Sequence, residues 1–186
     1  MSEFHSRHEL ALVAEDRCCV HLTTTMKPFS HACPWEEGRM QLFSEQDRWV
    51  EVVVDFQQGS HMAQLNRLSV ELRHCWLGER AGKFASARVR FPNLLTVNEE
   101  GDRSCLTCEL WEVGVPFKFP PGLVIEYDDD NYSLDWTLVE VEMKTTASPV
   151  KDERCAMYEA FFENDDCSDV LIVGERLKMK ASWLSS

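Results

Sequence analysis

Basic residues and long apolar runs are both scarce in this sequence. Lys and Arg number 19 against 32 Asp and Glu, which gives a formal net charge of -13. Binding to nucleic-acid phosphates depends on clustered Lys and Arg, so we expect no nucleic-acid partner and favour a basic or strongly polarised one. No stretch approaches the roughly 18 apolar residues of a membrane span, and no basic region near residue 1 leads into an apolar stretch. We therefore do not expect a membrane partner.

The sequence also lacks the features that mark a catalytic centre. Its 8 glycines are scattered and form no phosphate-binding loop, and no nucleophile elbow surrounds any residue. Its 8 cysteines could suggest a secreted disulfide framework, but 186 residues that are 44% hydrophobic can bury a core without one. We expect free thiols, no cofactor, and a reducing compartment, either cytoplasmic or nuclear. Because Cys and His are numerous, a small cysteine-dependent hydrolase stays open as an alternative.

Residues 59–62 read Gly-Ser-His-Met, the remnant that a cleaved purification tag commonly leaves ahead of a start methionine. We interpret this internal segment as an engineered junction in a fusion. It would separate a small β-rich piece, residues 1–58, from a larger domain, residues 63–186. Fused pieces usually bind each other, so residues 1–58 could represent a partner fragment. A natural polar turn between two strands is the alternative interpretation.

Alternation of apolar and polar residues recurs on both sides of this junction. It is clearest in Trp49–Phe56, where every second residue from Val50 onward is apolar. Strand-like runs with turn signals between them cover residues 9–14, 18–25, 39–43, 49–56, 67–73, 84–91, 106–113, 123–127 and 136–143. This pattern predicts a mostly β protein, built as an antiparallel β-sandwich.

One further stretch, residues 152–162, predicts a short helix. Asp152 can cap its start, and Ala156, Met157, Ala160 and Phe161 fall on one side at helical spacing. A strand is the alternative for these residues.

The first 58 residues are too few to hide much apolar surface alone. We expect their strands to pack on or extend the main sandwich by adding to a sheet. Five of the predicted contact residues lie on the clearest strand, residues 49–56: Trp49, Val50, Val52, Val54 and Phe56. The sixth, Trp76, lies at the end of another predicted strand. For Trp76 the alternative is a place in the core.

Carboxylates gather between the runs at 123–127 and 136–143, and calcium prefers six to eight such oxygen ligands. The stretch Leu123–Asp130 followed by Asp135 resembles the third loop of the synaptotagmin-type calcium- and lipid-binding sandwich. The resemblance implies Asp128, Asp130 and Asp135 as calcium ligands. This sequence lacks the family's companion acidic loop, because residues 78–83 offer one carboxylate beside two cations. A solvated turn is the alternative.

The same stretch is similar to the lipoxygenase-homology (PLAT) sandwich, in which a polar loop precedes a Trp-x-Leu-x-x-Val-x-Val strand. Trp136, Leu138, Val139 and Val141 come close to that arrangement, and Trp183-Leu184 is similar to the Trp-Leu that closes such domains. Both resemblances centre on residues 123–143. They imply a β-sandwich fold, and a fold alone does not establish function.

The spacing Cys105-x-x-Cys108 is typical of zinc ligands, and Cys18, His21, His31 and Cys33 could be further ligands. Residues three apart on a strand point to opposite faces, and no second such pair follows, so buried thiols are the favoured interpretation. The sequence therefore predicts a non-catalytic protein-interaction module, or scaffold, within a heteromeric complex. A calcium-regulated lipid-binding domain and the cysteine hydrolase remain the alternatives.

Overall fold

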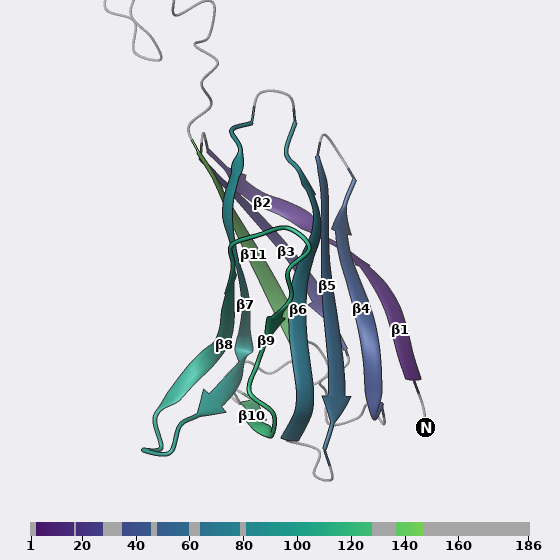
Figure 1. Ribbon diagram of the computed structural model, residues 1–186, viewed down its shortest axis with the longest axis vertical. Helices are drawn as coiled ribbons and strands as arrows, with labels where there is room; N and C mark the ends of the chain where they lie inside the picture. The colour runs from purple at the N-terminus through teal and green to yellow at the C-terminus, as the bar shows by residue number, and fades with distance from the viewer. Residues whose placement is uncertain are drawn as a thin grey trace, which may run out of the picture. The chain divides into compact units, whose positions relative to one another are not determined.

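The computed structural model describes residues 3–16, 18–27, 35–45, 48–59, 64–78, 81–127 and 137–146. That part of the chain contains eleven β-strands and no helix, so the prediction of a mostly β protein is confirmed (Figure 1). The chain divides into two compact units, Met1–Ala147 and Ser148–Ser186. The fold described below belongs to the first unit. The helix predicted over residues 152–162 lies outside the described residues.

The strands are β1 (Glu3–Glu9), β2 (Ala11–Glu15), β3 (Cys19–Met26), β4 (Glu37–Ser44), β5 (Trp49–Gln58), β6 (Gln64–Trp76), β7 (Phe84–Val97), β8 (Arg103–Leu110), β9 (Phe117–Lys118), β10 (Leu123–Tyr127) and β11 (Thr137–Thr145).

One half of the sheet is built from β1, β4, β5 and β6. β4, β5 and β6 pair antiparallel in chain order, and β1 pairs parallel with β4. The two-residue period explains how β5 sits: Val52 and Val54 point into the core, while Glu51 and Asp55 stay partly exposed on the other face.

The other half is built from β2, β3, β11, β7 and β8, all paired antiparallel with their neighbours. β11 repeats the alternation seen in β5, since Val139, Val141 and Met143 are buried and the residues between them are not. The strand-like runs at residues 9–14 and 18–25 form the antiparallel pair β2 and β3.

Two connections join the halves into one nearly closed, barrel-like sheet. At one side β10 pairs with β6 through Leu123 and Val124, and with β7 through Ile125–Tyr127. At the other side β1 continues through the buried Leu10 into β2, and the Leu10 amide donates a hydrogen bond of 2.6 Å to the carbonyl of Phe43. Figure 1 shows this continuous N-terminal ribbon. The predicted two-sheet sandwich is not confirmed, because these connections make the strand order continuous.

The interior is filled with apolar side chains. Phe56 and Phe91, from opposite halves of the sheet, are among the largest fully buried side chains, and they belong to one core cluster. Such a filled interior stabilises the sheet by removing apolar area from water, at roughly 25 cal/mol per Å².

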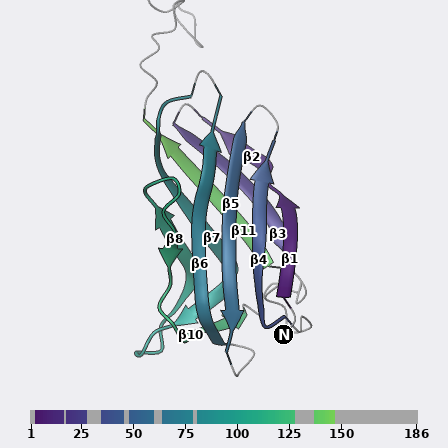
Figure 2. The ribbon, with the colours of Figure 1, turned by 45° about the vertical axis from the view of Figure 1, so that its right-hand side comes forward.

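The segment interpreted as a junction lies between β5 and β6. These two strands pair antiparallel from Trp49 opposite Trp76 to Gln58 opposite Leu65, and the Gly59 amide donates to the Gln64 carbonyl at 2.7 Å. β5 and β6 stand side by side in two views (Figures 1 and 2). Strands from residues 1–58 thus extend the sheet formed by the later ones. The division into two fused pieces stays a prediction.

Candidate protein-binding surface

Four of the six predicted interface residues lie in the core. Val50, Val52, Val54 and Phe56 are each 0% exposed. They hold β5 against the rest of the barrel-like sheet, so within the folded unit their side chains are not free to meet a separate protein.

The two predicted tryptophans have a different environment. Trp49 is 38% exposed, Trp76 is 53% exposed, and the two residues are direct partners in the β5–β6 register. Trp49 begins β5 and Trp76 ends β6, so the pair lies at one end of the sheet. Directly opposed residues in an antiparallel pair present their side chains on the same face. The register therefore gathers two large exposed aromatic groups.

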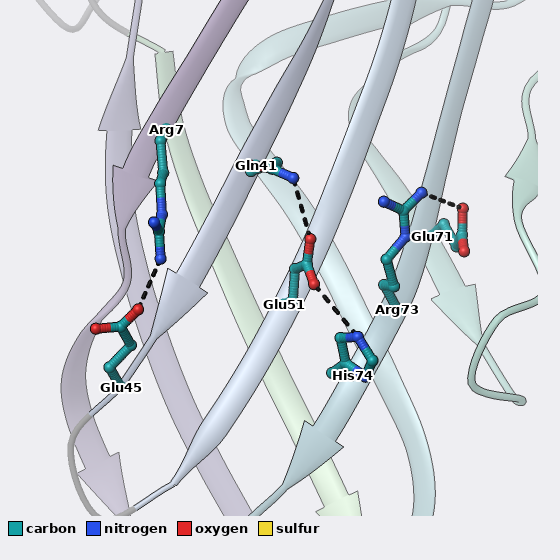
Figure 3. Close-up of polar contacts among 7 residues, drawn as sticks. All are labelled: Arg7, Gln41, Glu45, Glu51, Glu71, Arg73 and His74. Carbon is teal, nitrogen blue, oxygen red and sulfur yellow. Dashed lines mark hydrogen bonds and ion pairs between the residues drawn. The ribbon is translucent and has the colours of Figure 1, made fainter.

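A shallow hollow of about 200 Å³ lies beside Trp49. Its other lining residues come from three neighbouring strands: Arg7, Gln41, Phe43 and Glu51. The Arg7 guanidinium lies 3.8 Å from the centre of the Phe43 ring, a cation–π arrangement. Arg7 Nη2 also donates to Glu45 Oε1 at 2.6 Å (Figure 3). The hollow thus combines aromatic faces with a fixed cation.

Glu51 lies beside the hollow, and polar groups on both neighbouring strands hold it in place. Gln41 Nε2 donates to Glu51 Oε1 at 3.3 Å, and His74 Nε2 lies 3.7 Å from Glu51 Oε2. Further along β6, Arg73 pairs with Glu71 at 3.5 Å (Figure 3). Since the Glu51 side chain is only 13% exposed, this carboxylate is fixed in position. These polar groups lie next to the exposed tryptophans along β5 and β6, and they are called the polar rim below.

A second set of exposed apolar residues follows β8, and sequence reasoning missed it. Trp111 is 72% exposed, and Val113, Val115 and Phe117 are 41%, 51% and 38% exposed. Residues 106–113 are predicted as one strand, but β8 ends at Leu110. Gly114, at φ 82°, lies in the turn that follows. The Gly and Pro residues after Val113 were the available signal that the strand stops early.

A third exposed apolar element is β2, where Leu12 is 42% and Val13 64% exposed. An ion pair ties the end of β2 to the start of β5, since Arg48 Nη2 donates to Glu15 Oε2. Arg48 directly precedes Trp49. The exposed residues of β2 and the tryptophan pair therefore belong to the same end of the sheet.

The predicted calcium ligands Asp128, Asp130 and Asp135 lie outside the described residues. Within the described ranges, no group of three or more His, Cys, Asp or Glu residues could hold a metal ion. Cys105 and Cys108 lie on opposite faces of β8, as the strand period predicts. Cys108 is 3% exposed in the core, whereas Cys105 lies on the outer face.

The five described cysteines, Cys18, Cys19, Cys75, Cys105 and Cys108, are free thiols. Cys19 Sγ lies 3.2 Å from His21 Nε2, and such a cysteine–histidine contact is the arrangement that a cysteine hydrolase would need. Burial, together with the charges of Glu142 and Asp16, raises the pKa of Cys19. An activated nucleophile needs the opposite shift, so this contact does not favour the hydrolase alternative.

The described residues form strands and no helix, so they include no candidate for a membrane-spanning helix. No protein-family model, curated protein or solved structure matches this chain.

Proposed function

We propose that this chain is a non-catalytic protein-binding module that takes part in a heteromeric complex. The observation that carries the proposal is the facing pair Trp49 and Trp76, with exposed fractions of 38% and 53%. Tryptophan is among the residues that contribute most binding energy at protein interfaces, because it buries a large apolar area. A partner that covers both rings removes this area from water.

The surroundings of the pair support a protein as the ligand. Aromatic groups with arginine at the centre and a polar rim outside are the usual composition of protein interfaces. Here Arg7 stacked on Phe43 lies beside Trp49, and Glu51 is fixed by its neighbours. A net charge of -13 favours a partner with basic groups and opposes nucleic-acid phosphates.

The pairing of strands across residues 59–62 is compatible with a partner contained within the chain. Residues 1–58 contribute β5 to the edge of β6, and also β3 to the edge of β11. If this segment is a fused partner fragment, its binding mode is strand addition to the sheet of the larger piece.

We call Trp49, Trp76 and the hollow beside Trp49 the tryptophan surface. It can be tested with a photo-crosslinking amino acid placed at position 49 and, as a control, at position 94, where Leu94 is fully buried. We expect position 49 to yield a defined crosslinked protein in extract of the source cells, and Trp76→Ser to reduce its amount at least fivefold. Val124→Ser changes an exposed apolar residue that pairs with Gln64, at the other end of β6 from Trp76, and should leave the yield unchanged. Equal yields from Trp76→Ser and Val124→Ser would refute the surface.

A further inference from the structure

β2 differs from the longer strands in having no covered face. All five of its residues, Ala11–Glu15, are exposed, and four of them are apolar. Among the described strands, only the two-residue β9 is also exposed throughout. An apolar strand normally buries at least one face, so β2 is a local inconsistency of the kind that often marks a functional element.

Among the described strands, β2 is paired along one edge. It stands at the end of their order and pairs there with β3, through Ala11, Leu12, Ala14 and Glu15. The register shifts between Leu12 and Ala14, so Val13 has no partner on β3. Lysine and proline, which commonly protect sheet edges, are absent from this strand. Its second edge is paired with no described strand and can accept main-chain hydrogen bonds.

We propose that β2 is the edge to which a partner protein adds a strand, an inference that rests on the proposed binding function. A free edge is satisfied by an extended backbone, which fixes the conformation of the partner segment. The exposed Leu12 and Val13 then contact apolar residues at alternate positions of that segment.

Charge selects between kinds of partner strand. Glu9 lies two residues before Ala11, and Asp16 follows Glu15, which is paired with Arg48, so each end of the edge carries an additional carboxylate. A strand with an apolar centre and Lys or Arg at its ends complements this edge. A second copy of this chain brings the same acidic ends and a net charge of -13, which opposes self-pairing.

The edge is continuous with the tryptophan surface. The Arg48 side chain, only 9% exposed, pairs with Glu15 at the end of β2, and Trp49 follows Arg48 directly. One partner can therefore occupy the edge with its added strand and cover the tryptophans with its flanking residues. Figures 1 and 2 show β2 near the end of the sheet where β5 begins.

The test uses a synthetic peptide, Lys-Lys-Thr-Val-Thr-Val-Thr-Lys-Lys, and two comparison peptides. One has Glu in place of each Lys, and the other is N-methylated at alternate amides, which blocks strand pairing. We expect the basic peptide to bind the full chain and to slow hydrogen exchange in residues 11–15 at least tenfold. The Glu peptide should bind at least tenfold more weakly, and the methylated peptide should give no protection. Equal binding of the methylated peptide, or protection elsewhere, would overturn the proposal.

Two variants complete the test. Val13→Pro places a residue without an amide hydrogen at a position that has no partner on β3, so it should abolish peptide binding with little change in thermal stability. Val13→Thr keeps the amide and should retain binding within about threefold. If Val13→Pro lowers the thermal stability, the proposal is judged on the unmodified chain instead, by whether the basic peptide slows hydrogen exchange in residues 11–15. Crosslinking at position 49 without peptide protection at β2 refutes the edge and leaves the proposed function standing, whereas loss of crosslinking refutes the proposed function.

Discussion

β5 and β2 are both apolar strands, yet one is the centre of the fold and the other lies almost outside it. β5 has paired strands on both edges, and one face packs into the core through Val52, Val54 and Phe56. β2 is paired on one edge by a described strand, and all five of its residues are exposed. Apolar composition therefore does not decide burial in this protein. What decides it is whether neighbouring strands and an opposing layer are present.

The largest effect is expected from dividing the chain at the predicted junction, residues 59–62, between β5 and β6. We predict that residues 1–58 and 63–186, produced as separate chains, lack most of their β structure alone and gain it on mixing. The reason is that β5 loses the edge of β6 and β3 loses the edge of β11. Circular dichroism and sedimentation velocity of each piece and of the mixture measure this. Pieces that never co-migrate would show that strand addition does not hold them together.

The next largest effect is expected from a pair of substitutions, one on the core face of β5 and one on the exposed β2. Phe56→Ala removes a ring that is 0% exposed and should lower the free energy of unfolding by about 3–5 kcal/mol. Val13→Ala, at a residue 64% exposed, should change it by less than about 0.5 kcal/mol. Denaturant titrations of both variants give the two values. Similar losses would mean that β2 is covered in solution.

β8 also has a buried face and an outer face, and each face carries one thiol: Cys108 is buried and Cys105 lies on the outer face. Burial raises the pKa of Cys108 to about 12. For Cys105, burial acts in the same direction, but hydrogen bonds with Thr107 and Arg90 and the charge of Arg90 outweigh it, so the pKa is lowered. Arg90 Nε lies 3.1 Å from Cys105 Sγ.

Because the thiolate is the reactive form, a lowered pKa means that Cys105 is deprotonated at lower pH than an ordinary thiol. We predict that iodoacetamide at pH 7.5 alkylates Cys105 at least tenfold faster than Cys108, as followed by peptide mass spectrometry. Raising the pH to 9 should accelerate Cys105 less than a fully exposed model thiol, since its thiolate fraction is already larger. Arg90→Gln should slow the reaction of Cys105 and leave Cys108 unchanged. Equal rates in the folded chain would contradict the assignment of faces.

The sequence predicts β5 and β11 well because apolar residues recur at every second position in each, which indicates both the strand and its buried face. It predicts β2 as a strand but not its exposure, since the unbroken apolar run Ala11–Ala14 is typical of a strand buried on both faces. β1 was missed because Glu, His, Ser and Arg obscure its single inward phenylalanine, Phe4. The strand predicted over residues 106–113 ends at Leu110, and Trp111 just beyond it is 72% exposed. Local hydrophobicity cannot show where a strand ends relative to its neighbours.

Closure of the sheet was likewise beyond sequence reasoning. It depends on how β10 divides its pairing between β6 and β7, and on Leu10 leading β1 into β2. The alternation of each strand is the same in a sandwich and in a barrel-like sheet. Only the register of a few residues distinguishes the two arrangements.

The smallest effect is expected at the polar rim of the tryptophan surface. Arg7 and Glu45 have side chains that are 55% and 52% exposed, and ion pairs of this kind contribute only about 0–1 kcal/mol. The Arg7 contact with Phe43 adds about 0.5–1 kcal/mol at an exposed site. We therefore predict that Arg7→Gln lowers the free energy of unfolding by about 1 kcal/mol, and Glu45→Gln by about half of that.

High salt separates the two contributions, because it screens the ion pair and leaves most of the stacking. In 1 M NaCl the effect of Glu45→Gln should vanish, whereas Arg7→Gln should keep part of its effect. Denaturant titrations at low and high salt measure this. If Arg7→Gln also becomes neutral in salt, the cation–π contact contributes nothing to stability.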